Sequence, residues 1–436
     1  MRVTVLGGGF GGLASAARLA KLGHDVTLLE RSGALGGAMS RTMEGGFAWE
    51  NGPTTTGLPA VVRDLFRKSG RPLERELDLV PVPIIREHRF EDGSVIALPG
   101  ETRAGQYDAV QAATSAGDAW LSYVDSFADV WHTLRRDYYE RPYDPRHAER
   151  AATAILRERT SLHRRLRKTF KDERLKHLAT YDAVSQGHDP RDVPAWVGLT
   201  AYLEQNFGLW TIPGPAGSFG LSALTDALVT RLSTRKVKIS LNTDVRDVAV
   251  RDGRAVGVHT SEGDLDTDAV VVAIDPRRVP ALAPSVRKTM PALPPTVCFL
   301  GLEGEVPDLP AEVVLHGDPT LTVRTGGQAP EGHHAWTVHV RGMLGEDLLR
   351  ALARGGLDVR AQVVRRLDHT PREQVEQFAG SPMGVRWEGR GTVAARLGPR
   401  TPIPGVYAAG AHATPGAGVP AVGLSAALVA QVIGPA

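Results

Sequence analysis

The chain has 436 residues, a formal net charge of +2 and 42% hydrophobic residues. This length is too great for one simple core, so two closely packed domains are expected. The near-neutral charge argues against a dedicated nucleic-acid-binding protein. Cys298 is the single cysteine, which excludes a disulfide framework and a cysteine-based metal site. It lies in an apolar run, where a buried and unreactive thiol is expected.

The N-terminus reads directly as a strand and lacks the charged region, apolar region and cleavage site of a signal peptide. No stretch of about 20 uninterrupted apolar residues is present. A cytoplasmic protein is therefore expected, and peripheral contact with the inner face of a membrane stays open.

The first thirty residues predict a β-α-β unit. Arg2–Leu6 is a short apolar run typical of a buried parallel strand, and Gly7, Gly9 and Gly12 follow as G-x-G-x-x-G. Small and apolar residues then recur at helical spacing. Asp25–Glu30 forms a second strand that ends in an acid.

Each part of this unit suits a nucleotide diphosphate. Gly7 allows the tight turn, Gly9 lets the backbone approach a pyrophosphate, and Gly12 lets the helix pack close to the strand. The helix N-terminus offers unpaired N–H donors, and Glu30 would accept hydrogen bonds from a ribose. The alternative is a tight glycine turn without a ligand. The predicted cofactor-binding residues of this segment are Gly7, Gly9, Phe10, Gly11, Gly12 and Glu30.

The following residues resemble those of a known family. Glu30-Arg31, Leu35-Gly36-Gly37 and Gly52-Pro53 are similar to motifs of the flavin-dependent oxidoreductases that include bacterial phytoene desaturases, protoporphyrinogen oxidase and the amine oxidases. The resemblance implies bound FAD, with Arg31, Gly36, Gly37 and Ala38 near it. Ala38 stands where the family usually has an arginine, and Arg41 is a candidate to reach the phosphate instead.

The next segment is expected to be mostly helical. A short helix is predicted around Leu58–Lys68, and Pro83–Phe90 with Ser94–Leu98 form a hairpin. Residues 103–207 carry repeated apolar spacing with few helix breakers. Arginines and lysines surround Leu162, Leu166 and Phe170, which predicts either a solvated basic face or a patch that rests on anionic lipid.

The chain then returns to the nucleotide domain. Thr211–Gly220 is a glycine- and proline-rich loop without an apolar strand leading into it, and it opens a helix over Leu221–Leu232. The resemblance to the family implies a turn beside the active-site cavity and not a second nucleotide site. Val237–Leu241 and Ala269–Ile274 are predicted strands, separated by an antiparallel meander. In the resembling family the residue that matches Val245 contacts the adenine through its backbone; the alternative is a plain strand residue.

A second region follows. Thr296–Leu302, Leu321–Thr325 and Ala335–Arg341 are predicted strands, with a helix near Glu346–Leu367. This combination predicts an antiparallel sheet with a covering helix.

The last segment, Gly405–Gly423, predicts a strand, a glycine turn and a helix of small residues. It is similar to the C-terminal signature of the bacterial carotene desaturases. The resemblance places Gly410 and Ala411 at the phosphate-ribityl region and Val419-Pro420 under the isoalloxazine. An ordinary strand-turn-helix without a ligand is the alternative.

Together these elements predict an α/β fold: a Rossmann-like FAD-binding domain of the amine-oxidase type with an inserted α+β substrate domain. The predicted division is 1–75, 211–290 and 399–436 for FAD binding, 76–210 for a helical and hairpin substrate segment, and 291–398 for the antiparallel-sheet substrate domain.

The resemblance implies hydride transfer from an apolar, polyisoprenoid-like substrate to the flavin, with formation of a C=C bond. His412 is the candidate acid or base because imidazole titrates near neutrality, although a loop histidine without a chemical role is the alternative. His188, Asp189 and Arg191 are weaker candidates.

Amine oxidation is disfavoured within the family. The amine oxidases place a lysine in the strand that matches Thr296–Leu302, and this chain has no lysine after Lys288. Two alternatives remain beside a desaturase: a flavin oxidase of a small amine, porphyrinogen or natural product, and a non-enzymatic prenyl-binding protein.

Overall fold

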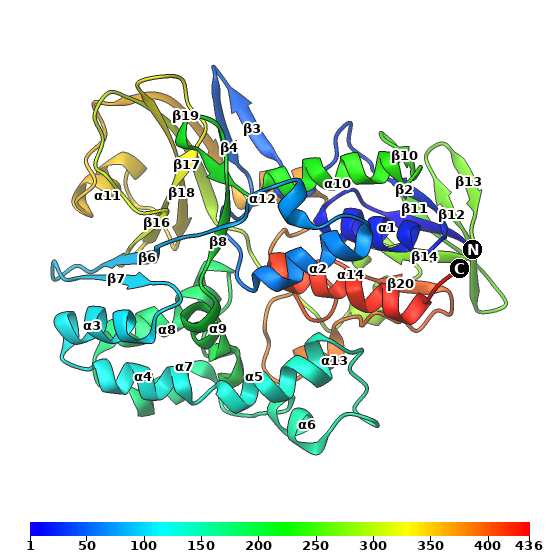
Figure 1. The fold of residues 1–436 in the computed structure, drawn as a ribbon, viewed down its shortest axis with the longest axis horizontal. Coiled ribbons are helices and arrows are strands. Elements are labelled where there is room, and N and C mark those ends of the chain that lie inside the picture. The colour runs from blue at the N-terminus through cyan, green and yellow to red at the C-terminus, as the bar shows by residue number, and fades with distance from the viewer.

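A five-stranded parallel sheet lies at one end of the molecule in the computed structural model, which describes residues 1–436 (Figure 1). Its strands, in spatial order, are β10 (Lys238–Ser240), β2 (Asp25–Leu29), β1 (Arg2–Leu6), β14 (Ala269–Val272) and β20 (Val406–Ala408). Residues from both ends of the sequence therefore share one sheet.

The two faces of this sheet are covered differently, and the side chains of β1 alternate accordingly. Val3 and Val5 belong to the buried cluster formed with four helices, whereas Leu6 belongs to the cluster under the antiparallel meander. The helices are α1 (Phe10–Lys21), α2 (Pro59–Ser69), α10 (Ser222–Thr234) and α14 (Val419–Ile433). The meander consists of β11 (Val245–Arg251), β12 (Arg254–Thr260) and β13 (Gly263–Asp266).

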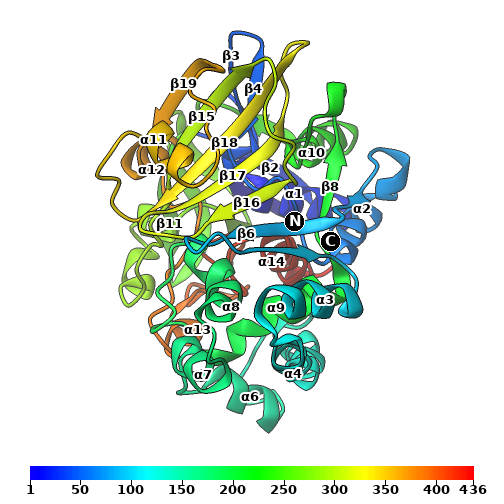
Figure 2. The ribbon, with the colours of Figure 1, turned by 90° about the vertical axis from the view of Figure 1, so that its left-hand side faces the viewer.

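A seven-stranded sheet forms the second region, and the predicted hairpin is part of it (Figure 2). In spatial order its strands are β19 (Val363–His369), β15 (Thr296–Glu303), β18 (His333–Arg341), β17 (Thr320–Gly327), β16 (Glu312–Leu315), β6 (Ile84–Arg89) and β7 (Val95–Pro99). β6 pairs in parallel with β16, while the other pairs are antiparallel.

Short helices form a layer beside this sheet (Figure 2). Residues 103–207 are mostly helical, but the chain is broken more often than its apolar spacing suggests, first at Ser115, which adopts φ 58°. The helices are α3 (Arg103–Thr114), α4 (Gly117–Asp125), α5 (Ala128–Leu134), α6 (Arg150–Leu156), α7 (Leu162–Thr169), α8 (Glu173–Ser185) and α9 (Leu199–Phe207). No helix of the protein combines the length and the apolar character needed to cross a membrane.

Two sequence expectations are wrong in detail. The helix predicted near Glu346–Leu367 is shorter in the structure, where it is α11 (Leu348–Arg354). The later residues of the predicted range lead into strand β19 and form its start. A strand, β8 (Trp210–Pro213), does lead into the loop that precedes α10, and it pairs with β5 (Val80–Pro81) and β9 (Phe219–Gly220). The remaining elements are β3 (Arg41–Glu44), β4 (Phe47–Glu50), α12 (Pro371–Phe378) and α13 (Thr392–Ala395).

Candidate functional site

The glycines of the first turn differ in how much room surrounds them. A Cβ on Gly12 would lie 1.9 Å from the carbonyl oxygen of Gly7, so only glycine lets α1 pack this closely. A Cβ on Gly9 would meet nothing closer than 4.0 Å. A Cβ at Gly9 would therefore fit against Gly36 and Gly37 without a clash, so the packing of the protein alone does not require glycine at this position.

The N-terminus of α1 lies beside this space. No side chain caps it, so its first N–H groups lack the partner that a capping oxygen would give. These groups and the helix dipole make the turn favourable for an anion such as a diphosphate.

Glu30 stands directly after β2, where its carboxylate bridges two backbone segments. Oε2 accepts from the N–H of Gly8 at 2.7 Å, and Oε1 accepts from the N–H and Oγ of Ser32, both at 2.8 Å. The carbonyl of Glu30 accepts from the N–H of Thr243 at 2.9 Å, which brings the start of β11 at Val245 toward the end of β2.

The second glycine pair closes on the first turn. The N–H of Gly36 donates to the carbonyl of Gly8 at 2.9 Å, and a Cβ on Gly37 would lie 3.1 Å from the Cα of Gly9. The carbonyl oxygen of Ala38 packs against Gly52, where a Cβ would lie 2.3 Å away. The motifs quoted for the resemblance thus surround one turn of the backbone.

The C-terminal signature meets the N-terminal one. A Cβ on Gly11 would lie 2.8 Å from the Cα of Gly410, and the N–H of Gly410 donates to Ser425 Oγ at 2.8 Å. Ala411 packs against the same helical core as α1. α14 begins at Val419, with Pro420 in its first turn and no side-chain cap. The N-terminal turn and the C-terminal turn therefore lie together, and α1 and α14 pack side by side (Figure 1).

The two arginines near the first turn make other contacts. The guanidinium of Arg31 donates to the carbonyls of Glu376 and Gln377, each at 2.7 Å, at the end of α12. Arg41 donates to Ser222 Oγ at 2.5 Å and to Glu50 at 3.3 Å. It lines a cavity of about 40 Å³ with the loop that leads into α10, instead of reaching toward the glycine turn.

His412 is buried within the C-terminal turn, with 7% of its surface exposed. Its Nε2 lies 3.1 Å from the carbonyl oxygen of Ser381, which can only accept, so Nε2 carries the proton. Nδ1 has no hydrogen-bond partner and lies 3.9 Å from Asp275 Oδ1. Burial lowers the pKa of His412, so the neutral ring with a free Nδ1 lone pair is favoured.

The three weaker candidates lie elsewhere. Asp189 pairs with Arg191 at 2.7 Å in a local surface contact. His188 is buried, and its Nδ1 lies 3.4 Å from the N–H of Trp387. Burial lowers its pKa to about 3, so it stays neutral at ordinary pH. None of the three contacts the two glycine turns.

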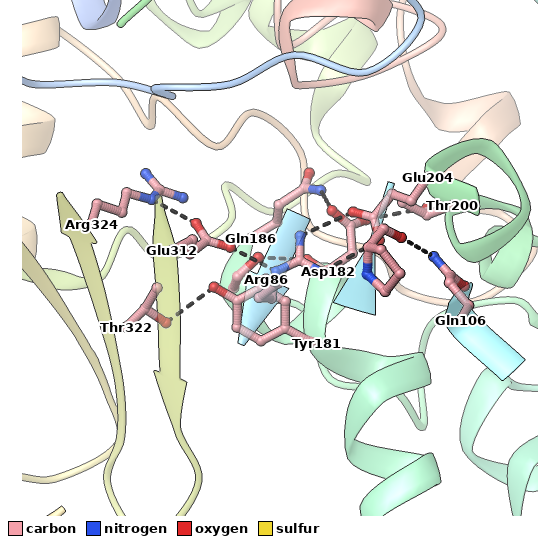
Figure 3. A network of polar contacts seen from close by, with 12 residues as sticks. Arg86, Gln106, Tyr181, Asp182, Gln186, Thr200, Glu204, Glu312, Thr322 and Arg324 are labelled. Atoms are coloured by element: carbon pink, nitrogen blue, oxygen red, sulfur yellow. Dashed lines mark hydrogen bonds and ion pairs between the residues drawn. The ribbon is translucent and has the colours of Figure 1, made fainter. Parts of the chain in front are cut away.

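The sequence analysis missed a buried ionic network between the seven-stranded sheet and the helical layer (Figure 3). Arg86 on β6 donates to Glu312 at 2.7 Å and to Glu204 at 2.9 Å, and Arg324 donates to Glu312 at 2.8 Å. These two guanidinium groups hold the pKa of Glu312 at about 2 despite its burial. Asp182 lies in the same network. The five charged residues of this network come from five separate elements, so no local sequence motif predicts it.

Comparison with known proteins decides the family. The family described as flavin containing amine oxidoreductases matches residues 10–434. The chain belongs to this family. It is therefore a flavin-dependent oxidoreductase, and the uncapped helix starts and the glycine at position 9, which the protein's own packing does not require, fit a bound dinucleotide.

Two similar proteins align with this chain over nearly their whole length. Hydroxyneurosporene desaturase of Cereibacter sphaeroides is 29% identical, covering 99% of this chain and 97% of the relative. The 4,4'-diapolycopene oxygenase of a Methylomonas species is 26% identical, covering 99% and 98%.

Solved structures support the fold. An oxidoreductase from Methanosarcina mazei aligns with a TM-score of 0.69 at 18% identity, covering 99% of this chain and 100% of the other. Putrescine oxidase aligns with a TM-score of 0.68 at 13% identity, covering 99% of both chains. The expected α/β fold, with a Rossmann-like domain of the flavin amine oxidase type, is confirmed.

Proposed function

We propose that this protein is an FAD-dependent desaturase of an apolar, polyisoprenoid-like substrate. The observation that carries the proposal is the meeting of Gly11 with Gly410, because it joins two distant glycine turns into one elongated cradle. A dinucleotide needs a site for its diphosphate and a second site for its flavin ring, and the two uncapped helices α1 and α14 supply them.

Individual residues take separate roles in this proposal. The first turn of α1 and the backbone at Gly9 receive the diphosphate, Glu30 binds the adenosine ribose, and Val245 lies by the adenine. Val419 and Pro420 lie under the flavin ring. The remaining predicted contacts are Gly7, Phe10, Gly12, Arg31, Gly36, Gly37, Ala38 and Ala411.

Bound FAD would supply a two-electron acceptor for a hydride from a substrate C–H bond. Formation of a C=C bond also requires a base for the neighbouring proton. We assign this role to His412, whose neutral ring has an unpartnered Nδ1. The ring is held by the contact of Nε2 with the carbonyl of Ser381.

The substrate class rests on the full-length relatives, whose names include desaturation of hydroxyneurosporene. The absence of any lysine after Lys288 supports this choice over amine oxidation. An oxidase of a small amine, a porphyrinogen or a natural product is the second candidate, which the fold similarity to putrescine oxidase keeps in view.

The first test is the absorbance spectrum of the purified protein, followed by the mass of the extracted cofactor. We expect one FAD per chain. A colourless protein that does not bind added FAD would contradict the proposal and would favour a binding protein.

The second test separates the enzyme candidates by reduction of the bound flavin without oxygen. We expect phytoene or a related polyisoprenoid to bleach the flavin absorbance, and putrescine and other amines to leave it unchanged. Bleaching by an amine alone would instead identify the oxidase.

A further inference from the structure

Arg396 is a buried cation that touches the C-terminal turn. It follows α13 directly, and 7% of its surface is exposed. Nη1 donates to the carbonyl of Pro415 at 3.1 Å, and Nη2 donates to the carbonyl of Val385 at 2.9 Å. Its guanidinium carbon lies 4.4 Å from the ring centre of Trp387, and Nε has no partner. Every contact of this charge is therefore neutral.

No carboxylate compensates this charge. No aspartate or glutamate side chain acts on the pKa of Arg396. Asp275, beside His412, pairs with Arg277 at 3.0 Å, and Asp192 pairs with Arg386 at 3.2 Å. The other titratable groups around Arg396 are neutral: His188 and His412, whose pKa values are lowered by burial, and Tyr138 and Tyr139, whose pKa values are raised by it.

Most other buried arginines of this protein have an acid partner. Arg18 pairs with Asp64 at 2.9 Å, Arg86 pairs with Glu204 and Glu312, and Arg231 pairs with Glu76. Arg341 also binds only carbonyls, those of Ser185 and Leu293, but it is partly exposed at the end of β18. A buried charge without a counter-ion is costly, so a fold that keeps one indicates an anion from outside the chain.

The position of Arg396 indicates which anion. A Cβ on Gly416 would lie 3.2 Å from Nη1, and Gly416 precedes the start of α14 by three residues. The positive end of the α14 dipole and the Arg396 charge are thus concentrated at the same turn. This is the turn that the proposed function places at the flavin ring.

We propose that Arg396 is the buried counter-charge for the reduced flavin, an inference that rests on the proposed function. A hydride brings two electrons and one proton to the neutral flavin, which leaves one negative charge on its pyrimidine ring. In a water-excluded site a nearby fixed cation favours that charge without supplying a second proton. Arg396 thereby makes hydride acceptance from an unactivated substrate more favourable.

The main test is the two-electron midpoint potential of the bound flavin, measured by spectroelectrochemistry on the holoprotein. Arg396→Met keeps the length of the side chain and removes the charge. We expect the equilibrium to shift at least tenfold toward oxidised flavin, which is a decrease of about 30 mV for a two-electron couple. Arg396→Lys is expected to stay closer to the wild-type potential.

Arg231→Met is the matched control. Arg231 is also buried, donates to the carbonyl of Phe66 and stacks on the Phe66 ring. Unlike Arg396, it forms an ion pair with a carboxylate, that of Glu76. Its loss is expected to lower stability without changing the potential. Equal potentials in wild type, Arg396→Met and the control would show that Arg396 only braces the turn, and would overturn the inference.

A measurement on the wild type keeps the test decisive if Arg396→Met does not fold. Uptake of one proton with two electrons makes the potential fall by about 30 mV per pH unit, and uptake of two protons by about 59 mV. We expect the smaller slope from pH 6 to 8. The larger slope would overturn the inference while leaving the proposed function intact, whereas a protein that binds no flavin would contradict the proposed function itself.

Discussion

Gly9 and Gly12 stand three positions apart in one turn and have opposite surroundings. A valine at Gly9 has an allowed φ of −74° and a Cβ without a close contact, so we expect Gly9→Val to fold normally and to lose flavin. Gly12→Ala forces its Cβ onto the carbonyl of Gly7 and is expected to cost about 1–3 kcal/mol of folding free energy. Thermal unfolding and flavin content measure both effects. Normal flavin content in Gly9→Val would contradict the diphosphate assignment.

Asp182 gives the stability of the protein a defined pH dependence. Burial and the nearby Glu204 raise its pKa to about 6, so the folded state binds this proton more tightly than the unfolded chain does. The contribution of Asp182 to stability is therefore fully present below about pH 4 and is lost as the pH rises through 6.

We expect Asp182→Asn to raise the free energy of unfolding by about 3 kcal/mol at pH 8 and to leave it unchanged at pH 4. Gln186 and Thr200, which donate to Asp182 in the wild type, can still bond the amide. Urea denaturation at the two pH values measures the difference. An equal effect at both would show that the charge of Asp182 is not the cause.

Single residues also show how far the sequence predicts the site. Glu30 is predictable because its distance from the glycines is part of a local pattern. The roles of Arg86 and Arg396 cannot be predicted in this way. They depend on whether an acidic side chain lies beside the guanidinium, and the groups that contact each arginine come from other elements of the fold. Arg31 is predicted to lie near the flavin; its guanidinium contacts α12, a helix that the sequence pattern did not reveal.

At the scale of elements, β19 shows why local patterns fail. Gly355 and Gly356 end α11, and the β-branched Val363 and Val364 favour a strand. The decisive contact is the ladder with β15, where Val297 pairs with His369, and that partner lies far away in the sequence. The strands of the parallel sheet were predictable because their apolar runs are buried on both faces.

Helix α7 presents a basic face whose charges are available. Arg164, Arg167 and Lys168 on α7, with Lys171 just after it, are exposed and take part in no ion pair. Leu162 and Leu166 are buried. We expect salt-sensitive binding to vesicles that contain anionic lipid, and none to neutral vesicles.

Reversal of Arg164, Arg167 and Lys168 to glutamate is expected to weaken this binding about 100-fold, at about 1 kcal/mol per residue. Arg251→Glu with Arg254→Glu, on the exposed hairpin of the meander, is the control. Vesicle co-sedimentation measures the binding. If both sets of variants bind vesicles as the wild type does, the basic face of α7 faces solvent and does not bind lipid.

At the scale of the whole molecule, the substrate region is assembled from two separate stretches of sequence. β6 and β7 join strands from residues 296–369 in one sheet, and the ionic network around Arg86 joins that sheet to α8 and α9 (Figure 3). We therefore propose that residues 76–210 and 291–398 act as one substrate region. The remaining ranges, 1–75, 211–290 and 399–436, would form the flavin domain.

We expect the contact of α1 with the late segment that contains α14 to affect biosynthesis. His24 contacts the carbonyl of Gly434, 410 positions further along the chain. At about 5–20 residues per second, a ribosome needs about 20–80 s to make the interval between them. Throughout that time α1 lacks α14, the helix that packs beside it. Under the proposed function, we therefore expect the flavin to bind only after residues 419–433 have been synthesised. Chains stalled before α14 should accumulate as colourless substrates for chaperones and proteases.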